Sequence, residues 1–161
     1  VKFSEAMINS VSDKYNIDKT RIWAVGFSNG GMLSYQLACE LSNKITAIGV
    51  GSGSLMGKSC DTKQPVSIIH LHGASDPKVL FNGSGFLNTR DVISNITTVN
   101  AQFGCVDVSS SLLEVTGQTT WKWNCQNGVD VQVNRYDGQG HEWLFAWTKE
   151  VIKFLFAHPR K

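Results

Sequence analysis

The sequence predicts an α/β fold in which a parallel sheet is flanked by helices on both faces. Short apolar runs rich in β-branched residues alternate along the chain with longer segments that carry apolar residues at helical spacing. Such βα alternation is typical of a parallel sheet covered on both sides. Several strand-like runs also end in short polar or glycine-rich segments, and open α/β sheets build their sites at the carboxyl ends of the strands.

The first half of the chain supplies two helices and two strands. Residues 1–15 carry apolar side chains at roughly helical spacing, and residues 21–27 are β-branched and aromatic enough for a buried parallel strand. Residues 32–41 return to helical spacing. Residues 46–53 form an apolar run whose small side chains would let neighbouring backbone pack closely.

The second half continues the pattern. Residues 65–73 form a strand-like run, residues 89–103 have apolar side chains at helical intervals, and residues 129–136 alternate like a strand. Residues 142–157 then form a helix that can cover the sheet. Tryptophans alternate with polar side chains over residues 121–124, which suits a half-buried strand face better than a platform for a sugar.

Length and composition fit a single domain over residues 1–161. The chain is 42% hydrophobic and 17% charged, and it has no repeat or low-complexity run. Its net charge of +2 is spread over segments that also carry acids, so it lacks the basic patch that nucleic acid requires. No run approaches the roughly 18 consecutive apolar residues of a membrane span, and the amino terminus shows no signal-peptide pattern. We therefore expect neither nucleic acid nor a membrane as a partner.

Residues 26–30 read Gly-Phe-Ser-Asn-Gly and lie where a predicted strand stops and a predicted helix starts. In that context the motif is a nucleophile elbow, because the sharp turn strains the serine backbone and exposes its hydroxyl. Ser28 is therefore the candidate nucleophile. The helix start would favour an oxyanion, with the backbone N–H of Asn29 as one expected donor. The alternative is a surface turn that happens to contain a serine.

A serine hydroxyl is a poor nucleophile without a base, so the motif predicts an acid and then a histidine downstream. Asp76 follows the strand-like run 65–73, and His141 follows the run 129–136 on a glycine-rich loop. Three strands would thus bring one residue each to the same edge of the sheet. The prediction is Ser28 as nucleophile, Asp76 as orienting acid and His141 as general base. This chemistry needs no metal or cofactor, because side chains and water suffice.

Three blocks of sequence carry a family resemblance. They are the region of residues 15–40 around the elbow, then His70-Leu71-His72-Gly73-Ala74-Ser75-Asp76-Pro77, then Gly138-Gln139-Gly140-His141-Glu142-Trp143. Together they resemble the secreted esterases of the polyhydroxybutyrate depolymerase and feruloyl esterase group within the α/β-hydrolases. The resemblance runs nearly the whole length and implies the same Ser28, Asp76 and His141 triad. It departs after Trp143, where the family often continues with Pro-Gly and this chain does not.

The resemblance implies a secreted or periplasmic enzyme that hydrolyses carboxylic esters. Its substrates would be polyhydroxyalkanoates, which are polymers, or feruloyl and acetyl esters on plant polysaccharides. The same triad would serve a serine peptidase of the prolyl oligopeptidase type, and an incomplete, non-catalytic hydrolase or binding module is a further alternative. Phe27 and Trp143 are the candidate substrate-binding residues, although an aromatic residue after His141 could equally pack the last helix.

The front of the domain is where the chain departs most from the resembling family. Members of that family carry several strands before the helix that precedes the elbow strand, whereas this chain begins inside that helix. We therefore expect a partial domain without the N-terminal strands and without the loop that supplies a second oxyanion N–H. The elbow strand would then leave an apolar edge open to water, to a second copy in a homo-oligomer, or to another chain.

Four cysteines form an even set without a Cys-x-x-Cys pair, which favours two disulfides over a zinc site. Three pairings are possible. Proximity in the chain and the resemblance favour Cys39 with Cys60 and Cys105 with Cys125.

The remaining histidines have structural interpretations. His70 lies within a strand, where a hydrogen-bonded core residue is expected. His72 is closer to the strand end and to Asp76, so we expect it to line or brace the site. His158 lies in the C-terminal segment, where fraying is expected.

Overall fold

The structure is a computed structural model and describes residues 1–57, 60, 62–85, 87–113 and 117–160. The strands are β1 (Trp23–Phe27), β2 (Ala47–Gly51), β3 (Ser67–Gly73), β4 (Val106–Leu113), β5 (Gln118–Asn124) and β6 (Asp130–Tyr136). The helices are α1 (Lys2–Lys14), α2 (Asn29–Glu40), α3 (Val92–Asn100) and α4 (Phe145–Ala157), with a short 3-10 turn, η1 (Gln126–Gly128). Within the described ranges the strands form one six-stranded sheet in the order β1-β2-β3-β6-β5-β4.

The sheet is parallel where the sequence predicts it and ends in an antiparallel hairpin. Strands β1, β2, β3 and β6 run parallel, whereas β5 is antiparallel to both β6 and β4. The tryptophans of the hairpin face the core: Trp123 is 5% exposed, and Trp121 stacks on Phe81 with ring centroids 5.9 Å apart. These positions fit a half-buried strand face.

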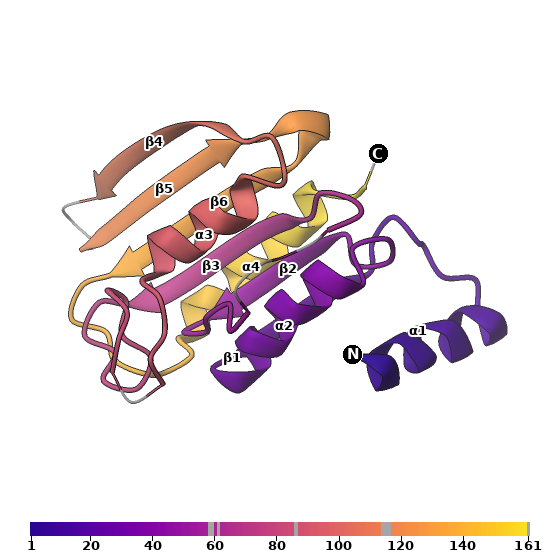
Figure 1. Cartoon of the computed structure of the whole chain (residues 1–161), viewed down its shortest axis with the longest axis horizontal. Helices are drawn as coiled ribbons and strands as arrows, with labels where there is room; N and C mark the ends of the chain where they lie inside the picture. Colours follow the sequence, from indigo (N-terminus) through magenta and orange to yellow (C-terminus); the bar gives the residue numbers. More distant parts are fainter. Residues whose placement is uncertain (58–59, 61, 86, 114–116, 161) are drawn as a thin grey trace.

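Helices cover both faces of the sheet, as predicted (Figure 1). Successive side chains of a strand point to opposite faces. Ile68 accordingly belongs to the buried cluster that includes residues of α2 and α3, whereas Ile69 and Leu71 pack with α4. Every residue of β2 and β3 is buried, which is typical of central parallel strands. The α/β architecture is therefore confirmed.

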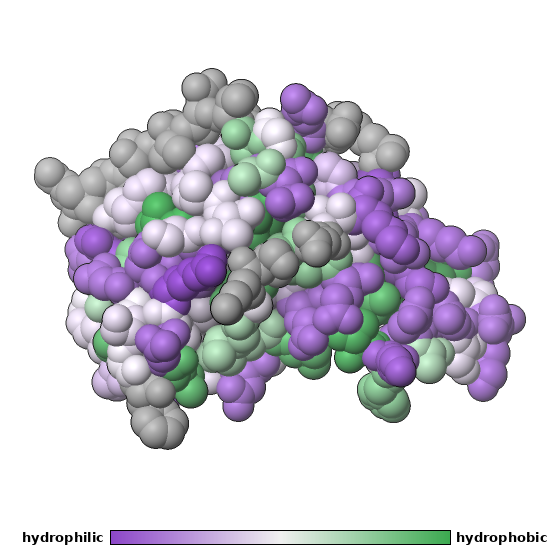
Figure 2. Space-filling model, viewed as in Figure 1, coloured by the Kyte–Doolittle hydropathy of each residue, from purple (hydrophilic) through white to green (hydrophobic). Residues whose placement is uncertain are grey.

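The elbow strand β1 is less buried than its apolar sequence predicts. In the described part of the chain it pairs with β2 alone, and Val25 is 52% exposed. The prediction of a buried strand is wrong, whereas the expectation of an open edge at the elbow strand agrees with its place at the edge of the described sheet. Helix α1 buries none of its residues and lies beside the sheet (Figure 1). Figure 2 shows hydrophobic residues exposed along the lower edge of this face, near α2 and α1.

The C-terminal segment is held in place, so the expectation of fraying is wrong. His158 has Nδ1 2.7 Å from the Phe154 carbonyl and Nε2 2.7 Å from the Asp130 carboxylate. The guanidinium of Arg160 donates to the carbonyls of Ser42 and Ile45 at 2.6 and 2.8 Å. These contacts tie the residues after α4 to β6 and to the segment before β2.

Two disulfides cross-link the fold. One links Cys39 in the last turn of α2 to Cys60 in the segment after β2, and the other links Cys105 before β4 to Cys125 after β5. Their sequence separations are 21 and 20 residues. Each therefore closes a loop of moderate length.

Removing the Cys39–Cys60 disulfide will destabilise the chain. The double variant Cys39→Ala/Cys60→Ala should lose about 3 kcal/mol of the free energy of unfolding, because the cross-link no longer restricts the unfolded chain. Urea unfolding followed by circular dichroism measures the loss. The pair Cys105→Ala/Cys125→Ala, with nearly the same loop length, is the matched comparison and should lose a similar amount. An unchanged urea midpoint would contradict the expectation.

Candidate active site

The predicted elbow is the turn between β1 and α2. Ser28 lies between the two elements with φ of 54° and ψ of −120°. A positive φ is strained for a residue with a Cβ, and such strain is concentrated at functional sites. Two backbone hydrogen bonds hold the turn: the Ser28 N–H donates to the Gly51 carbonyl at 2.8 Å, and the Ser28 carbonyl accepts from the Met32 N–H at 3.0 Å.

The first glycine of the motif leaves no room for a side chain. A Cβ at Gly26 would lie 2.1 Å from the carbonyl carbon of Gly30 and 2.7 Å from the nitrogen of Gly31. These are backbone atoms, so they could give way only if the turn opened. Gly26 thus allows α2 to start directly beside the end of β1. Gly30 has open space where a Cβ would be, so no close approach of neighbouring atoms requires a glycine there.

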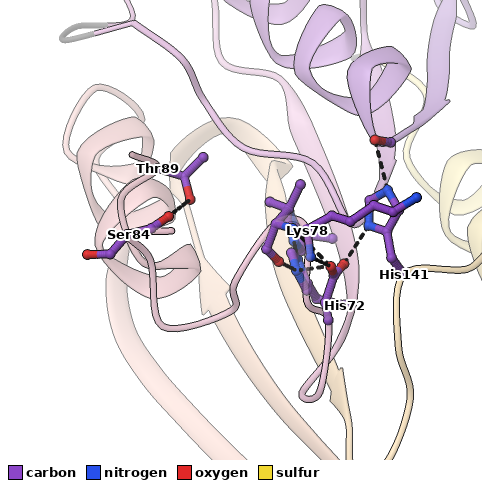
Figure 3. Close-up of polar contacts among 9 residues, drawn as sticks. His72, Lys78, Ser84, Thr89 and His141 are labelled. Carbon is purple, nitrogen blue, oxygen red and sulfur yellow. Dashed lines mark hydrogen bonds and ion pairs between the residues drawn. The ribbon is translucent and has the colours of Figure 1, made fainter. Parts of the chain in front are cut away.

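The structure brings Ser28, Asp76 and His141 together at the carboxyl edge of the sheet. His141 Nε2 is 3.0 Å from Ser28 Oγ, and His141 Nδ1 is 2.8 Å from Asp76 Oδ2. Figure 3 shows these contacts as dashed lines on either side of the His141 ring. The residues meet because β1, β3 and β6 are parallel and end at the same edge of one sheet.

The carboxylate of Asp76 is buried and surrounded by donors. Its Oδ1 accepts hydrogen bonds from the N–H groups of Lys78 and Val79, both at 2.9 Å. Burial alone would raise the pKa of this carboxyl, but the hydrogen bonds from His141, Val79 and Lys78 outweigh burial and hold the pKa below its usual value. Asp76 is therefore ionised at neutral pH. An ionised carboxylate next to Nδ1 keeps the proton there and leaves Nε2 of His141 free to accept one from Ser28.

The predicted oxyanion donor, the N–H of Asn29, follows Ser28 directly in the chain. It belongs to the first turn of α2, where N–H groups have no carbonyl partner within the helix. A cleft of about 580 Å³ extends from Asn29 along α2, between Met32 and Leu33 on the helix and Leu55 and Met56 after β2. The sequence did not indicate this cleft, because Leu55 and Met56, which line its other side, lie beside α2 only in the folded chain.

Both predicted substrate-binding aromatic residues lie near His141. The Phe27 ring centroid is 4.8 Å from that of His141. Trp143 packs over Gly51, where a Cβ would come within 2.7 Å of the indole and 3.3 Å of the Phe27 ring. Trp147, by contrast, is fully buried and packs the last helix against the sheet. Trp143 also contacts the last helix, because its ring lies 5.9 Å from that of Trp147 and its indole N–H donates to the Thr148 hydroxyl at 2.9 Å.

His70 and His72 are buried beside the triad. His70 is hydrogen-bonded in the core, and His72 Nε2 lies 3.5 Å from Asp76 Oδ2.

No group of three or more histidine, cysteine, aspartate or glutamate side chains in the described ranges is arranged to hold a metal ion. Among the helices that the structure describes, none is both long enough and apolar enough to cross a membrane.

A family model described as phospholipase/carboxylesterase matches residues 4–112, a span that includes the elbow and Asp76. The match covers more than half of the chain. This chain belongs to the phospholipase/carboxylesterase family. The α/β-hydrolase fold that the sequence predicts is the fold of this family.

Relatives of this phospholipase/carboxylesterase family member carry the names of esterases. A probable feruloyl esterase C of Aspergillus niger is 31% identical over 144 residues, which are 88% of this chain and 50% of that protein. A bifunctional acetylxylan esterase/xylanase of Neocallimastix patriciarum is 29% identical over 155 residues, 92% of this chain and 22% of that protein. The chain thus spans half or less of the length of these relatives. The resemblance to feruloyl esterases is confirmed.

Solved structures agree with the fold of the phospholipase/carboxylesterase family. Acetyl xylan esterase from Aspergillus awamori superposes with a TM-score of 0.67 at 12% identity and covers 96% of this chain and 66% of its own. A thermostable esterase gives a TM-score of 0.63 at 20% identity, over 98% of this chain and 36% of its own. At these identities the similarity shows a shared fold.

Proposed function

We propose that this chain is the catalytic part of a serine ester hydrolase with Ser28, His141 and Asp76 as its triad. The observation that carries the proposal is the unbroken hydrogen-bond chain from Ser28 Oγ through the His141 ring to Asp76. His141 accepts the proton of Ser28 as the hydroxyl oxygen attacks the ester carbonyl, and Asp76 stabilises the resulting imidazolium. His141 then protonates the departing alcohol, and a water molecule that it deprotonates releases the acid from Ser28.

The N-terminus of α2 beside Ser28 would stabilise the negative charge that develops in this reaction. Attack on the carbonyl places a negative charge on its oxygen, and the Asn29 N–H at the positive end of α2 is the donor we assign to it. A donor that is already in place needs no reorganisation at the moment of attack, which is why such groups lower the barrier.

The substrate we assign is a feruloyl or acetyl ester of a polysaccharide. The Phe27 and Trp143 rings beside His141 offer an apolar, flat surface that suits an aromatic acyl group. The cleft along α2 opens next to Asn29 and provides space for the rest of the substrate. The names of the relatives, feruloyl esterase and acetylxylan esterase, support the same two acyl groups.

Two disulfides support a location outside the cytoplasm. Disulfides persist in oxidising compartments and are rare where thiols are kept reduced. We therefore assign the protein to the periplasm or the outside of the cell. Its polysaccharide substrates would be polymers in that location.

Labelling with a fluorophosphonate probe tests the assembled triad. We expect the purified chain to gain the mass of one probe, and the variants Ser28→Ala and His141→Ala to gain none, because the probe reacts only with an activated serine. Ser75→Ala is the matched control, since Ser75 is an exposed serine at the same edge of the sheet, and it should label like the parent chain. Intact-mass spectrometry reads the result.

The same samples separate an esterase from the alternatives. Hydrolysis of methyl ferulate and p-nitrophenyl acetate without cleavage of a matching p-nitroanilide amide supports the esterase. Faster cleavage of the amide would identify a peptidase instead. A folded chain that neither labels nor hydrolyses esters would overturn the proposal and leave a non-catalytic module.

A further inference from the structure

A buried row of hydrogen bonds begins on the elbow helix and crosses into β3. The Tyr35 hydroxyl of α2 is 2.7 Å from His70 Nδ1, and His70 Nε2 is 2.9 Å from His72 Nδ1. His72 Nε2 is in turn 2.7 Å from the carbonyl oxygen of Val79. Tyr35, His70 and His72 are each at most 1% exposed. The two imidazoles stack with their planes only 5° apart.

The row ends at the turn that carries Asp76, where Figure 3 shows His72 beside the contacts of the triad. Val79, whose carbonyl faces His72, donates its own N–H to Asp76 Oδ1 at 2.9 Å. His72 Nε2 is also 3.5 Å from Asp76 Oδ2, the oxygen that lies 2.8 Å from His141 Nδ1. His72 therefore contacts the main chain that holds the carboxylate and faces the carboxylate itself.

The partners determine which nitrogen of each ring carries a proton. A carbonyl oxygen and a carboxylate can only accept, so His72 donates from Nε2, and in the neutral ring its Nδ1 accepts. His70 must then donate from Nε2 and accept at Nδ1, which makes the Tyr35 hydroxyl the first donor. A single arrangement of protons satisfies the whole row, and each donor points along the row toward the Val79 carbonyl, in the turn that carries Asp76.

Burial keeps both imidazoles uncharged. It lowers the pKa of His70 well below the usual value, and the neighbouring His72 adds to this effect. Burial also lowers the pKa of His72, although its hydrogen bond to Val79 and the charge of Asp76 act in the opposite direction. Neutral rings keep the arrangement of protons unchanged through the pH range in which a serine hydrolase works.

The ionisable groups around His72 come from several elements. Arg135 of β6 is separated from His72 by the Phe81 ring, because its guanidinium lies 5.8 Å from the centroid of that ring, which packs edge-on against the imidazole. The groups that face His72 or its partner directly are Tyr35 from α2, His70 from β3, Asp76 from the following turn and His141 from the loop before α4. Asp76 is ionised at neutral pH, because the hydrogen bonds that it accepts hold the pKa of its carboxyl below the usual value.

We propose that His72 is a positioning residue for the triad: it orients the Asp76 carboxylate toward His141, and His70 and Tyr35 hold it in the required tautomer. This inference rests on the proposed function of the triad. His72 acts through Asp76 and contacts no reacting atom. Without its Nε2–H, the Asp76 turn loses a tether and the carboxylate loses a nearby donor. Loss of the tether lets the carboxylate move out of line with His141 Nδ1, which slows the proton transfer and lowers kcat. Loss of the donor leaves the negative charge of the carboxylate less stabilised, which favours the imidazolium and moves the acid limb of the pH profile.

Two substitutions of His72 distinguish the effect of losing the Nε2–H donor from the effect of losing the imidazole ring. His72→Asn keeps an acceptor near the Nδ1 position for His70 but has no donor that reaches Val79 and Asp76, whereas His72→Gln keeps an amide donor near the Nε2 position. We expect His72→Asn to lower kcat for p-nitrophenyl acetate by about 10- to 100-fold with KM roughly unchanged. The acid limb of kcat/KM should move to higher pH. His72→Gln should restore most of kcat and return the acid limb.

The outcomes distinguish this inference from the function on which it rests. An active parent chain with unchanged kcat and pH profile in folded His72→Asn overturns the inference and leaves the esterase intact. So does a loss of kcat without a shift of the acid limb or without recovery in His72→Gln, because a structural role alone would produce that pattern. If the parent chain has no ester turnover, the proposed function fails.

A readout that needs no activity decides the inference in that case. The His141 Nδ1 proton that faces Asp76 should give a downfield resonance in proton NMR spectra. We expect this resonance to shift in His72→Asn and to return toward its original position in His72→Gln. The same frequency in all three folded proteins would overturn the inference. Proton–nitrogen spectra of the imidazoles should also show His70 and His72 as neutral Nε2–H tautomers, and a protonated ring would contradict the assignment.

Discussion

Replacing His141 with alanine will reduce ester hydrolysis by about ten-thousand- to million-fold, and replacing Ser28 as well will cost little more. The two residues share one proton transfer, since His141 Nε2 and Ser28 Oγ are 3.0 Å apart. Without the base the hydroxyl is not activated, and without the hydroxyl the base has nothing to activate. The measurement is kcat/KM for p-nitrophenyl acetate in the parent chain, Ser28→Ala, His141→Ala and the double variant.

A second histidine provides the matched control. His158 is bonded to Asp130 at the start of β6, the opposite end of that strand from His141. The variant His158→Gln should therefore keep near-normal kcat/KM. If the loss of kcat/KM in the double variant equals the product of the losses in Ser28→Ala and His141→Ala, the two residues do not share a catalytic step. A His141→Ala variant that keeps a tenth of the parent activity would also contradict the assignment.

Asp76→Asn will keep the fold but lower kcat by about ten-thousand-fold. Oδ1 of Asp76 accepts from the N–H groups of Lys78 and Val79, so the amide oxygen of an asparagine must take that position. Its NH2 group then faces His141 Nδ1, which can only accept. The proton of the imidazole moves to Nε2, and this nitrogen can no longer accept the proton of Ser28.

The difference in stability between the parent chain and Asp76→Asn should depend on pH in one direction. The pKa of Asp76 lies below its usual value in the folded chain, so the carboxylate contributes stability above the unfolded pKa of about 4 that is lost as pH falls through the folded pKa. Chemical unfolding should thus separate parent and variant at pH 7 and bring them together in acid. Asp137→Asn, which removes an exposed ion pair with Arg135, is the control and should change kcat little. A tenfold or smaller loss of kcat in Asp76→Asn would contradict the assigned role.

The parts of the site that the sequence predicts are those fixed by local structure. A strand, a serine with flanking glycines and a helix define the elbow without reference to the rest of the chain. Asp76 and His141 each follow a strand, and parallel strands bring such residues to one edge whatever their separation. Most strand and helix positions follow from apolar periodicity, because it records which side of each element is buried. Strand β4 is not among them, since no strand is expected from the sequence over residues 106–113.

The remaining features depend on which elements are neighbours. The edge position of β1, the Leu55 wall of the cleft and the anchoring of Arg160 all arise from contacts between distant segments. The row from Tyr35 to His72 is a further example, since nothing near Tyr35 in the sequence marks it as the partner of a histidine on β3. Periodicity predicts that such residues are buried but not what they bind.

Gly51 has a consequence for how the acyl specificity of such a protein can evolve. A Cβ there would come within 2.7 Å of the Trp143 ring and 3.3 Å of the Phe27 ring, so a side chain at this position requires the indole to move. A single substitution of Gly51 would therefore also disturb Trp143. Leu33 and Met56 across the α2 cleft are 42% and 56% exposed and can be exchanged one at a time. We expect libraries selected for new esters to accumulate changes on the cleft side and to retain the glycine.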